Sequence, residues 1–188
     1  MEHKTERLIL REYALTDSEN LYRLFKEDFV STYEAHLQFN SVSEVEDYIR
    51  FHVNNAKSAN RTHHYYAIEL QNTRVFLGSI GYSFVEEQII DGNCGRVTEL
   101  EYYLLEEHWN KGYMTEALKK VISLAFMDGN ILRIFAQCHV ENTASEGVMI
   151  KCGMRKSQIQ PRPKMYNGVL KENVRYEISI DNPPRTTK

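Results

Sequence analysis

The sequence has few cysteines and no long apolar run. Its three cysteines, Cys94, Cys138 and Cys152, are odd in number and scattered. Neither a Cys-x-x-Cys pair nor a Cys/His spacing typical of zinc appears, so we expect reduced thiols and no metal. No apolar run approaches the roughly 20 residues that cross a bilayer, and the N-terminal stretch MEHKTERLIL lacks the apolar core of a signal peptide. The sequence therefore predicts a cytoplasmic protein with no membrane partner.

The sequence also lacks an excess of charge of either sign. Its formal net charge is −3, which gives no general electrostatic case for binding nucleic acid. The 188 residues, 42% of them hydrophobic, suffice for one core. We predict a single domain over residues 1–180. Residues 181–188, DNPPRTTK, hold no apolar anchor and are predicted to be a frayed tail.

Hydrophobic periodicity predicts a mixed α/β fold. Helices are expected from near residue 17, over 43–56, after 112 and over 142–152, between strands at 7–13, 64–70, 75–84, 97–105, 133–140, 154–159 and 174–180. The short connection 71–74 indicates an antiparallel hairpin, residues 86–96 are predicted to be a loop, and Asn167-Gly168 signals a turn. The result is a largely antiparallel sheet with helices on both faces. Strands 97–105 and 133–140 are joined through a helix and should be parallel.

Two helix starts are predicted from capping boxes, in which a Ser or Thr precedes a Glu by three residues. Thr16-x-x-Glu19 predicts a first helix that begins near Asp17. Ser43-x-x-Glu46 predicts a second helix. On its apolar face we expect the residues at helical spacing, which are Val45, Tyr48, Ile49, Val53 and Ala56.

The chain is organised around residues 97–115, VTELEYYLLEEHWNKGYMT, which predict a strand, a tight turn at Gly112 and the start of a helix. The first N–H groups of a helix have no intrahelical partner, and the aligned peptide dipoles add positive charge there. Such a turn suits a phosphate or pyrophosphate, and Gly112 lets the backbone approach it closely. Lys111 adds a full charge. Taken alone, a single glycine before a helix is more often only a connection.

The segments after this helix favour an anion-binding turn over a simple connection. RIFAQCHV at 133–140 predicts a strand, and the following helix is opened by Asn142 and closed by Gly153. The motifs E-L-x-Y-Y-L, W-x-K-G-Y-x-T-E-A, R-I-x-A, N-x-x-S and K-x-G-M together resemble the GNAT acetyltransferase superfamily. Within it, the ribosomal-protein N-acetyltransferase (RimJ/RimL) branch is the most similar. The motifs cover residues 97–180.

The resemblance implies an acetyl-CoA-dependent enzyme that needs no metal. The two parallel strands would splay apart and hold the cofactor in the gap. The backbone N–H groups that would hold its pyrophosphate belong to Asn110, Lys111, Gly112, Tyr113, Met114 and Thr115. The family turn usually runs Q/R-x-x-G-x-G/A, whereas this chain has Trp109 first and the bulkier Met114 last.

Other positions follow from the same resemblance. Tyr103, Leu104 and Leu105 would pair their main chain with the pantetheine arm, although as side chains they also suit core packing. Asn142 would contact that arm, with an ordinary N-cap as the alternative. Ser145 is the candidate general acid for the leaving thiolate, and a serine in a first helical turn is also common for structural reasons.

Two glutamates are candidates for the acceptor amine. Glu99 and Glu101 stand at i and i+2 on a strand, so they share a face. Either could bind an ammonium and take its proton, directly or through water. By resemblance Glu99 matches the family's glutamate, whereas Glu101 stands where glycine is frequent. The alternative is a solvated strand face or a structural ion pair.

These features predict an N-acetyltransferase that moves acetyl from acetyl-CoA to a primary amine by direct transfer in a ternary complex. A protein N-terminal α-amine is the preferred acceptor, because its unperturbed pKa of about 7.7–8.0 means that it needs little help to become nucleophilic. A small amine such as a polyamine or antibiotic is the nearest rival, and a non-catalytic CoA-binding regulatory domain is another. Residues 26–42 and 158–172 should form the acceptor side, and a homodimer is left open.

Overall fold

The computed structural model describes residues 1–34, 37–90, 92–128, 130–159, 161, 163–166 and 169–180. The chain divides into two compact units. The first comprises Met1–Tyr82 with Glu101–Ala117, and the second Ser83–Leu100 with Leu118–Lys188. Two strands and one helix pass from one unit to the other, so each unit is described by itself.

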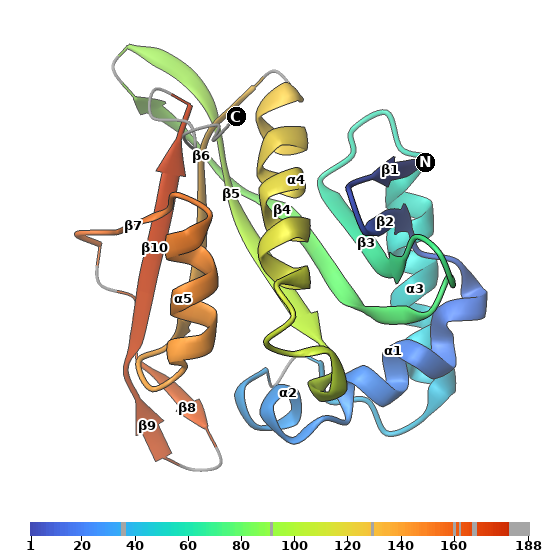
Figure 1. Ribbon diagram of the computed structural model, residues 1–188. Helices are drawn as coiled ribbons and strands as arrows, with labels where there is room; N and C mark the ends of the chain where they lie inside the picture. The colour runs from blue at the N-terminus through green and yellow to red at the C-terminus, as the bar shows by residue number, and fades with distance from the viewer. Residues whose placement is uncertain are drawn as a thin grey trace. The chain divides into compact units, whose positions relative to one another are not determined.

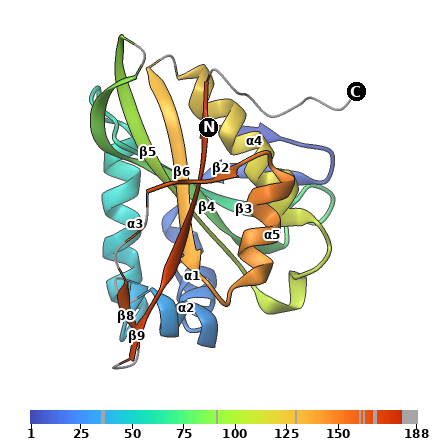
Figure 2. The same cartoon turned by 90° about the vertical axis from the view of Figure 1, so that its left-hand side faces the viewer.

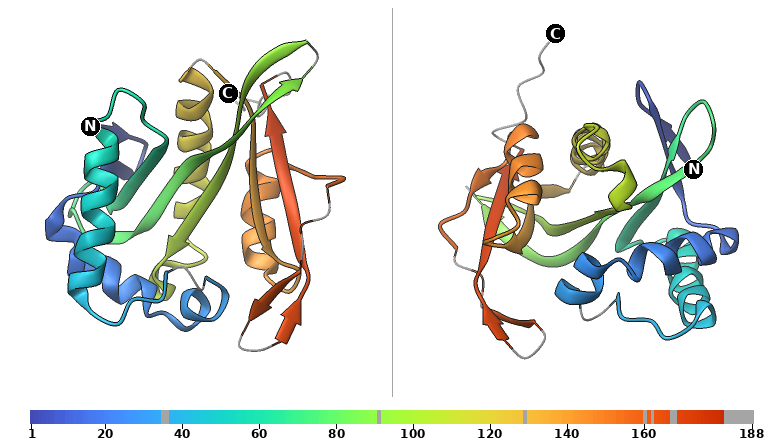
Figure 3. Two further views of the ribbon diagram at one scale, coloured as in Figure 1. Left: turned by 180° about the vertical axis from the view of Figure 1, so that it is seen from behind. Right: turned by 60° about the horizontal axis from the view of Figure 1, so that its bottom comes forward.

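The first unit carries the N-terminal strands and helices. Its strands follow the order β1-β2-β3-β4-β5, and helices and 3-10 turns complete the unit. Helix α3 packs against α1 and β3 (Figure 3). The elements are β1 (Glu2–Lys4), β2 (Leu8–Glu12), η1 (Leu15–Asp17), α1 (Ser18–Phe25), α2 (Asp28–Tyr33), α3 (Val42–Ala56), β3 (His63–Leu70), the first part of β4 (Phe76–Ile90), the last part of β5 (Asn93–Leu104), η3 (Glu106–His108) and the first turn of α4 (Tyr113–Met127).

The core of the first unit follows from its apolar spacing. In β2, Leu8, Ile9 and Leu10 are all buried, and Leu10 lies opposite Ile68 of the antiparallel neighbour β3. The stripe predicted for the second helix is present, since Val45 and Ile49 of α3 are fully buried. Burial of such side chains contributes about 25 cal/mol per Å² of apolar surface. These strands and helices therefore form the core beside the end of β5 and the turn before α4.

The second unit carries the C-terminal strands in the order β4-β5-β6-β10-β7. Strands β6 and β10 are antiparallel, with Ala136 opposite Tyr176, and α5 lies along them (Figure 1). Strands β8 and β9 form a separate two-stranded ladder near the start of β10 (Figure 2). The elements not yet bounded are β6 (Ile131–His139), α5 (Thr143–Lys151), β7 (Arg155–Lys156), β8 (Lys164–Tyr166), β9 (Val169–Lys171) and β10 (Asn173–Ser179).

The predicted parallel pair is confirmed. Strand β5 pairs parallel with β6, from Arg96 opposite Ile131 to Glu99 opposite Phe135. The sheet is otherwise mostly antiparallel, as the periodicity and short connections predicted. The ladder of described pairs ends at Glu99, while β5 itself continues to Leu104.

The loop predicted for residues 86–96 is wrong. Strand β4 continues to Ile90 and β5 begins at Asn93, so almost the whole segment is strand. Gly95 explains the error, because this glycine marks a close approach between β5 and residues 130–132 and does not mark a loop. A Cβ there would lie 2.6 Å from the Leu132 side chain and 2.9 Å from the Asn130 carbonyl oxygen. A glycine inside a strand often marks such an approach.

Both predicted capping boxes are wrong in position. Helix α3 begins at Val42, because Ser41 is its N-cap and accepts a 3.3 Å hydrogen bond from the Glu44 amide. The same Ser-x-x-Glu spacing occurs two residues later, at Ser43 and Glu46, and was the one chosen. Helix α1 begins at Ser18 after a 3-10 turn, so Thr16 does not cap it.

The helix predicted after Gly112 is confirmed and begins at Tyr113. Its predicted stripe is fully buried, namely Ala117, Leu118, Val121, Ile122 and Ala125. The short β1 and α2 were not predicted. The predicted turn at Asn167-Gly168 and the tail 181–188 lie outside the described residues, and the single-domain prediction stays a prediction. No helix in the described part of the chain is both long and apolar enough to cross a bilayer.

Candidate functional site

The turn before α4 has an unusual backbone. Asn110 has φ 58° and Gly112 has φ 77°, both in the left-handed region. The turn is tied to the preceding strand, because Trp109 Nε1 donates a 2.8 Å hydrogen bond to the Leu104 carbonyl. Lys111 Nζ donates to the Glu107 carbonyl at 2.8 Å. Two left-handed residues in three reverse the chain sharply between η3 and the start of α4.

The first turn of α4 presents backbone donors. The Glu116 amide donates to the Gly112 carbonyl at 3.1 Å, which is the first bond of the helical pattern. The amides of Tyr113 and Met114 precede it, at helix positions whose N–H groups have no acceptor in the helix's own pattern. Gly112 is exposed, and the predicted anion site therefore has its donors on an accessible turn.

Met114 departs from the small residue usual at its position, yet its bulk lies inside the protein. Its exposed fraction is 7%. The side chain therefore packs into the interior of the protein.

The strand end before the turn is buried. Tyr103, Leu104 and Leu105 have exposed fractions of 9%, 6% and 1%, which shows the predicted core packing. Part of their main chain is already bonded, since the Leu105 amide donates to the Leu77 carbonyl at 2.9 Å. The Leu104 carbonyl accepts from Trp109, and a carbonyl oxygen has a second lone pair.

Sequence reasoning missed two residues that hold the turn. The Glu116 carboxylate accepts hydrogen bonds from Thr5 Oγ1 (2.6 Å), the Arg7 amide (2.8 Å) and Arg7 Nε (2.7 Å). Arg7 Nη1 also donates to the Lys111 carbonyl at 3.0 Å. Burial by itself would raise the pKa of Glu116, but the hydrogen bonds from Thr5 and Arg7 outweigh it and lower that pKa. No spacing in the sequence links Arg7 to a turn more than a hundred residues away.

In the second unit, Asn142 and Ser145 open α5 as predicted. Asn142 is the N-cap, and its Oδ1 accepts a 3.0 Å hydrogen bond from the Ser145 amide. The Cys138 thiol donates a 3.9 Å hydrogen bond to the Asn142 carbonyl. Burial raises the pKa of that thiol to about 11, and hydrogen bonding to the nearby Ser145 opposes the rise. Ser145 therefore lies among polar groups at the end of β6.

Tyr176 reaches the same first turn of α5. Its hydroxyl donates a 2.5 Å hydrogen bond to the Glu146 carboxylate. This bond, with burial, raises the pKa of Tyr176 to about 12. The tyrosine stays protonated at neutral pH and fixes Glu146, the neighbour of Ser145.

The two candidate glutamates have different partners. In the second unit, Glu99 Oε1 accepts a 2.9 Å hydrogen bond from Gln137 Nε2. Arg175 lies opposite Gln137 on β10. Burial lowers the pKa of Arg175, and the charges of nearby carboxylates, Glu177 and then Glu99, oppose that shift. Glu99 is thus half-buried on a strand face that also holds a cation.

In the first unit, Glu101 accepts a 2.6 Å hydrogen bond from the Tyr65 hydroxyl. Tyr65 belongs to an aromatic cluster with Tyr13, Tyr48 and His52. Glu101 is half-buried at this cluster. A carboxylate beside tyrosine rings suits an ammonium group, because the rings can add cation–π attraction.

Three histidines of the described residues have local partners. His63 Nδ1 shares a 2.8 Å hydrogen bond with Thr62 Oγ1, and His139 Nδ1 accepts from the Glu141 amide at 3.2 Å. His64 stacks on the Tyr82 ring. These contacts favour a structural role for all three.

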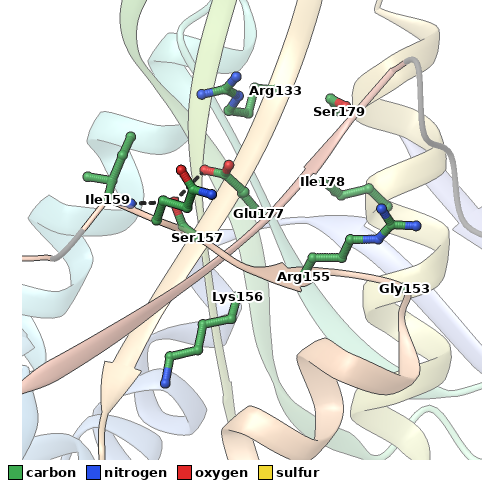
Figure 4. Close-up of a pocket in the computed structure, with 10 residues that line it drawn as sticks. Arg133, Gly153, Arg155, Lys156, Ser157, Ile159, Glu177, Ile178 and Ser179 are labelled. Atoms are coloured by element: carbon green, nitrogen blue, oxygen red, sulfur yellow. Dashed lines mark hydrogen bonds between the residues drawn. The ribbon is translucent and has the colours of Figure 1, made fainter.

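A cavity of about 470 Å³ lies in the second unit, over β10 and β7 (Figure 4). Its cations, Arg133, Arg155 and Lys156, point in different directions (Figure 4). Glu177 lies among them and accepts a 2.9 Å hydrogen bond from Ser157 Oγ. The cations do not converge on one point, so this cavity does not form an anion site. Among the described residues, no three His, Cys, Asp or Glu side chains gather into a metal site.

Comparisons with known proteins agree with this geometry. The family model for the acetyltransferase (GNAT) domain matches residues 7–155. A protein of Bacillus licheniformis, the uncharacterized N-acetyltransferase p20, is 32% identical over 144 residues, which are 75% of each chain.

Two solved structures have the same fold. The ribosomal-protein α-N-acetyltransferase RimL in complex with coenzyme A gives a TM-score of 0.78 at 19% identity and covers 95% of this chain and 97% of its own. The microcin C7 self-immunity acetyltransferase MccE, in complex with acetyl-CoA and AMP, gives 0.74 at 22% identity and covers 94% of each chain. The matched family model and the curated relative show that this chain belongs to the GNAT acetyltransferase family.

Proposed function

We propose that this N-acetyltransferase transfers acetyl from acetyl-CoA to a protein N-terminal α-amine, in the cytoplasm and by direct transfer in a ternary complex. The observation that carries the acetyl-CoA part is the turn at Gly112. It combines two left-handed residues, an exposed glycine and the positive end of a 15-residue helix. These features fit a pyrophosphate. The residues that would hold it are Asn110, Lys111, Gly112, Tyr113, Met114 and Thr115.

The reaction needs little from the protein. The amine nitrogen attacks the thioester carbonyl, a C–N bond forms, the C–S bond breaks, and one proton passes from the amine to a base. We assign the base or amine contact to Glu99, with Glu101 as the competitor. Ser145 gives a proton to the departing thiolate. The main chain of Tyr103–Leu105 and the Asn142 amide group hold the pantetheine arm.

The α-amine assignment rests on the proton balance. A free α-amine has a pKa of about 7.7–8.0, so roughly a tenth of it is already neutral at pH 7, and the base need only take the proton that is released as the C–N bond forms. The likeness to RimL adds a structural neighbour that acts on a ribosomal protein.

A small amine is the second candidate. It is favoured by the Tyr65–Glu101 pair, which suits a compact ammonium, and by the likeness to MccE.

A thiol-release assay separates these candidates. Acetyl-CoA is mixed with N-terminal peptides, polyamines or aminoglycosides, and free CoA is measured with a thiol reagent. We expect turnover with peptides whose α-amine is free and none with the same peptides after N-acetylation. Turnover confined to polyamines or aminoglycosides would assign the second candidate. Tight acetyl-CoA binding without release for any amine would contradict both.

Gly112→Asp tests the pyrophosphate assignment. The new side chain would begin 3.4 Å from Arg7 Nη2 and would bring a negative charge to the turn, so acetyl-CoA affinity should fall by at least about tenfold, as calorimetry measures it. Gly112→Asn is the matched control, because it brings the same size and the same backbone strain at φ 77° without the charge. Equal affinities for the Asp and Asn variants, both folded by circular dichroism, would place the cofactor elsewhere.

A further inference from the structure

Arg7 contacts the turn before α4. It stands just before β2, and its guanidinium extends to the turn. Its Nη1 donates to the Lys111 carbonyl, and its Cζ lies 4.6 Å from the centre of the Tyr113 ring. Arg7 thus contacts the residues on both sides of Gly112.

The bond to Lys111 fixes the direction of one peptide plane. In a trans peptide the C=O and the following N–H point in opposite directions. Because the Lys111 carbonyl points to Arg7, the Gly112 N–H points away from it. Rotating this peptide would break the bond with Nη1. Arg7 therefore sets which way one of the proposed pyrophosphate donors faces.

Glu116 fixes Arg7 in turn. Its carboxylate bonds Arg7 Nε at 2.7 Å and the Arg7 amide at 2.8 Å, while Thr5 Oγ1 donates to it at 2.6 Å. Glu116 lies in the first turn of α4, where a negative charge is favourable. The Arg7 side chain is therefore held at both ends, although 44% of its surface is exposed.

We propose that Arg7 is a positioning residue for the pyrophosphate of acetyl-CoA, acting through the Lys111–Gly112 peptide. This inference rests on the proposed function, because it assumes that acetyl-CoA binds at this turn. The positive charge of Arg7 also raises the local potential for an anion. Arg7 Nη2 lies close to Gly112, since a Cβ built on that glycine would be 3.4 Å from it. Glu116 serves the same end by orienting the guanidinium.

The guanidinium geometry is needed for this role. One planar fork serves the Glu116 carboxylate through Nε and the Lys111 carbonyl through Nη1. A lysine has a single nitrogen on a flexible stem and cannot hold both partners in one plane. Arg7→Lys should therefore keep the charge and lose most of the positioning.

The test compares two acetyl donors. Acetyl-CoA carries the pyrophosphate, and acetyl-pantetheine presents the same thioester without it. Steady-state kinetics are measured for Arg7→Gln and Arg7→Lys with both donors and one acceptor. We expect the KM for acetyl-CoA to rise by roughly tenfold in Arg7→Gln, the size of one hydrogen bond to a charged group. The kcat/KM for acetyl-pantetheine should stay within about twofold.

The ratio of the two donors is its own control for folding, because a misfolded fraction lowers both rates equally. Arg50→Gln is the matched control. Arg50 is 49% exposed and pairs with Glu46 on the surface of α3. Its donor ratio should equal that of the wild type.

The inference is overturned if Arg7→Gln loses activity equally with both donors, or if neither KM changes. A wild-type protein that is inactive with both donors, and does not bind CoA, would instead overturn the proposed function. Should Arg7→Gln fail to fold, Glu116→Gln offers the same comparison, because it releases the Arg7 fork and should shift the donor ratio in the same direction.

Discussion

At the scale of single residues, the acceptor chemistry depends on two carboxylates on one strand. Glu99 is bonded by Gln137, whereas Glu101 is bonded by Tyr65 beside an aromatic cluster. Their alternation along β5 could be predicted from the sequence because the side-chain period of a strand is two. Their partners could not, because Gln137 and Tyr65 come from other strands.

Glu99→Gln keeps the size of the side chain and removes its charge. We expect a higher KM for the amine, a lower kcat, or both, with acetyl-CoA affinity near that of the wild type. The loss should be larger at neutral pH than above about pH 9, where the free α-amine is abundant without a base. The pH–rate profile measures this.

Glu101→Gln is run in parallel as the competing assignment. A profile that flattens only in the Glu101 variant would transfer the role to Glu101. If neither profile changes, the acidic face is structural.

Arg7 shows why part of the candidate site could not be predicted. The turn at Gly112 follows from local signals, namely a strand pattern, a glycine and helical spacing. The contact that orients it joins residues 104 positions apart. Only the folded chain brings them together.

At the scale of elements, local signals predicted which segments form helices and strands better than where they begin. Helix α4 was placed correctly because Gly112 is left-handed and the apolar stripe begins directly after it. The N-cap of helix α3 is two residues earlier than predicted, because two Ser-x-x-Glu patterns overlap and Ser41, not Ser43, accepts the capping hydrogen bond. Strand β4 extends to Ile90, beyond the predicted end at residue 84. The two glycines within 86–96 are typical of a loop, but glycines also occur inside strands.

The first turn of α5 carries a prediction at this scale. Asn142 caps the helix through its side chain, and this bond places the Ser145 backbone. If Ser145 protonates the leaving thiolate, it acts only as that thiolate departs. Ser145→Ala should then lower kcat by between about 10²- and 10⁴-fold and leave acetyl-CoA affinity nearly unchanged.

Rapid-quench and steady-state rates are compared to show that chemistry limits the variant. A loss below about threefold under that condition would leave Ser145 with a structural role only. Ser145→Thr keeps the hydroxyl and serves as the conservative control, whose activity should exceed that of the Ala variant.

At the scale of the molecule, stability should depend on pH through a buried histidine. His52 is 7% exposed, and its Nδ1 has no hydrogen-bond partner among the described residues. It packs among Tyr13, Tyr48 and Tyr65, near His63. Burial, followed by the positive charges of His63 and Arg61, lowers the pKa of His52 to about 3.

The sign of the effect follows from proton linkage. An unfolded histidine has a pKa of about 6.5, so between pH 6.5 and 3 the unfolded chain binds one more proton at this residue. The free energy of unfolding is therefore highest above pH 6.5 and falls as the pH drops. Between pH 7 and pH 5, His52 alone should lower it by about 2 kcal/mol. Over this range, carboxyl groups with ordinary pKa values stay mostly ionised, so the histidines dominate the change.

His52→Phe removes the titrating group and keeps an aromatic ring in the cluster. Urea unfolding of the wild type and the variant at pH 7 and pH 5 measures the effect as a difference of differences, in which any packing change cancels. We expect the variant to lose about 2 kcal/mol less than the wild type between the two pH values. Equal losses would mean that His52 has the same pKa in the folded and the unfolded chain. Such a group contributes nothing to the change of the free energy of unfolding with pH. A larger loss in the variant would assign the acid sensitivity to His63, whose pKa burial also lowers and which His52 would then have been shielding from solvent.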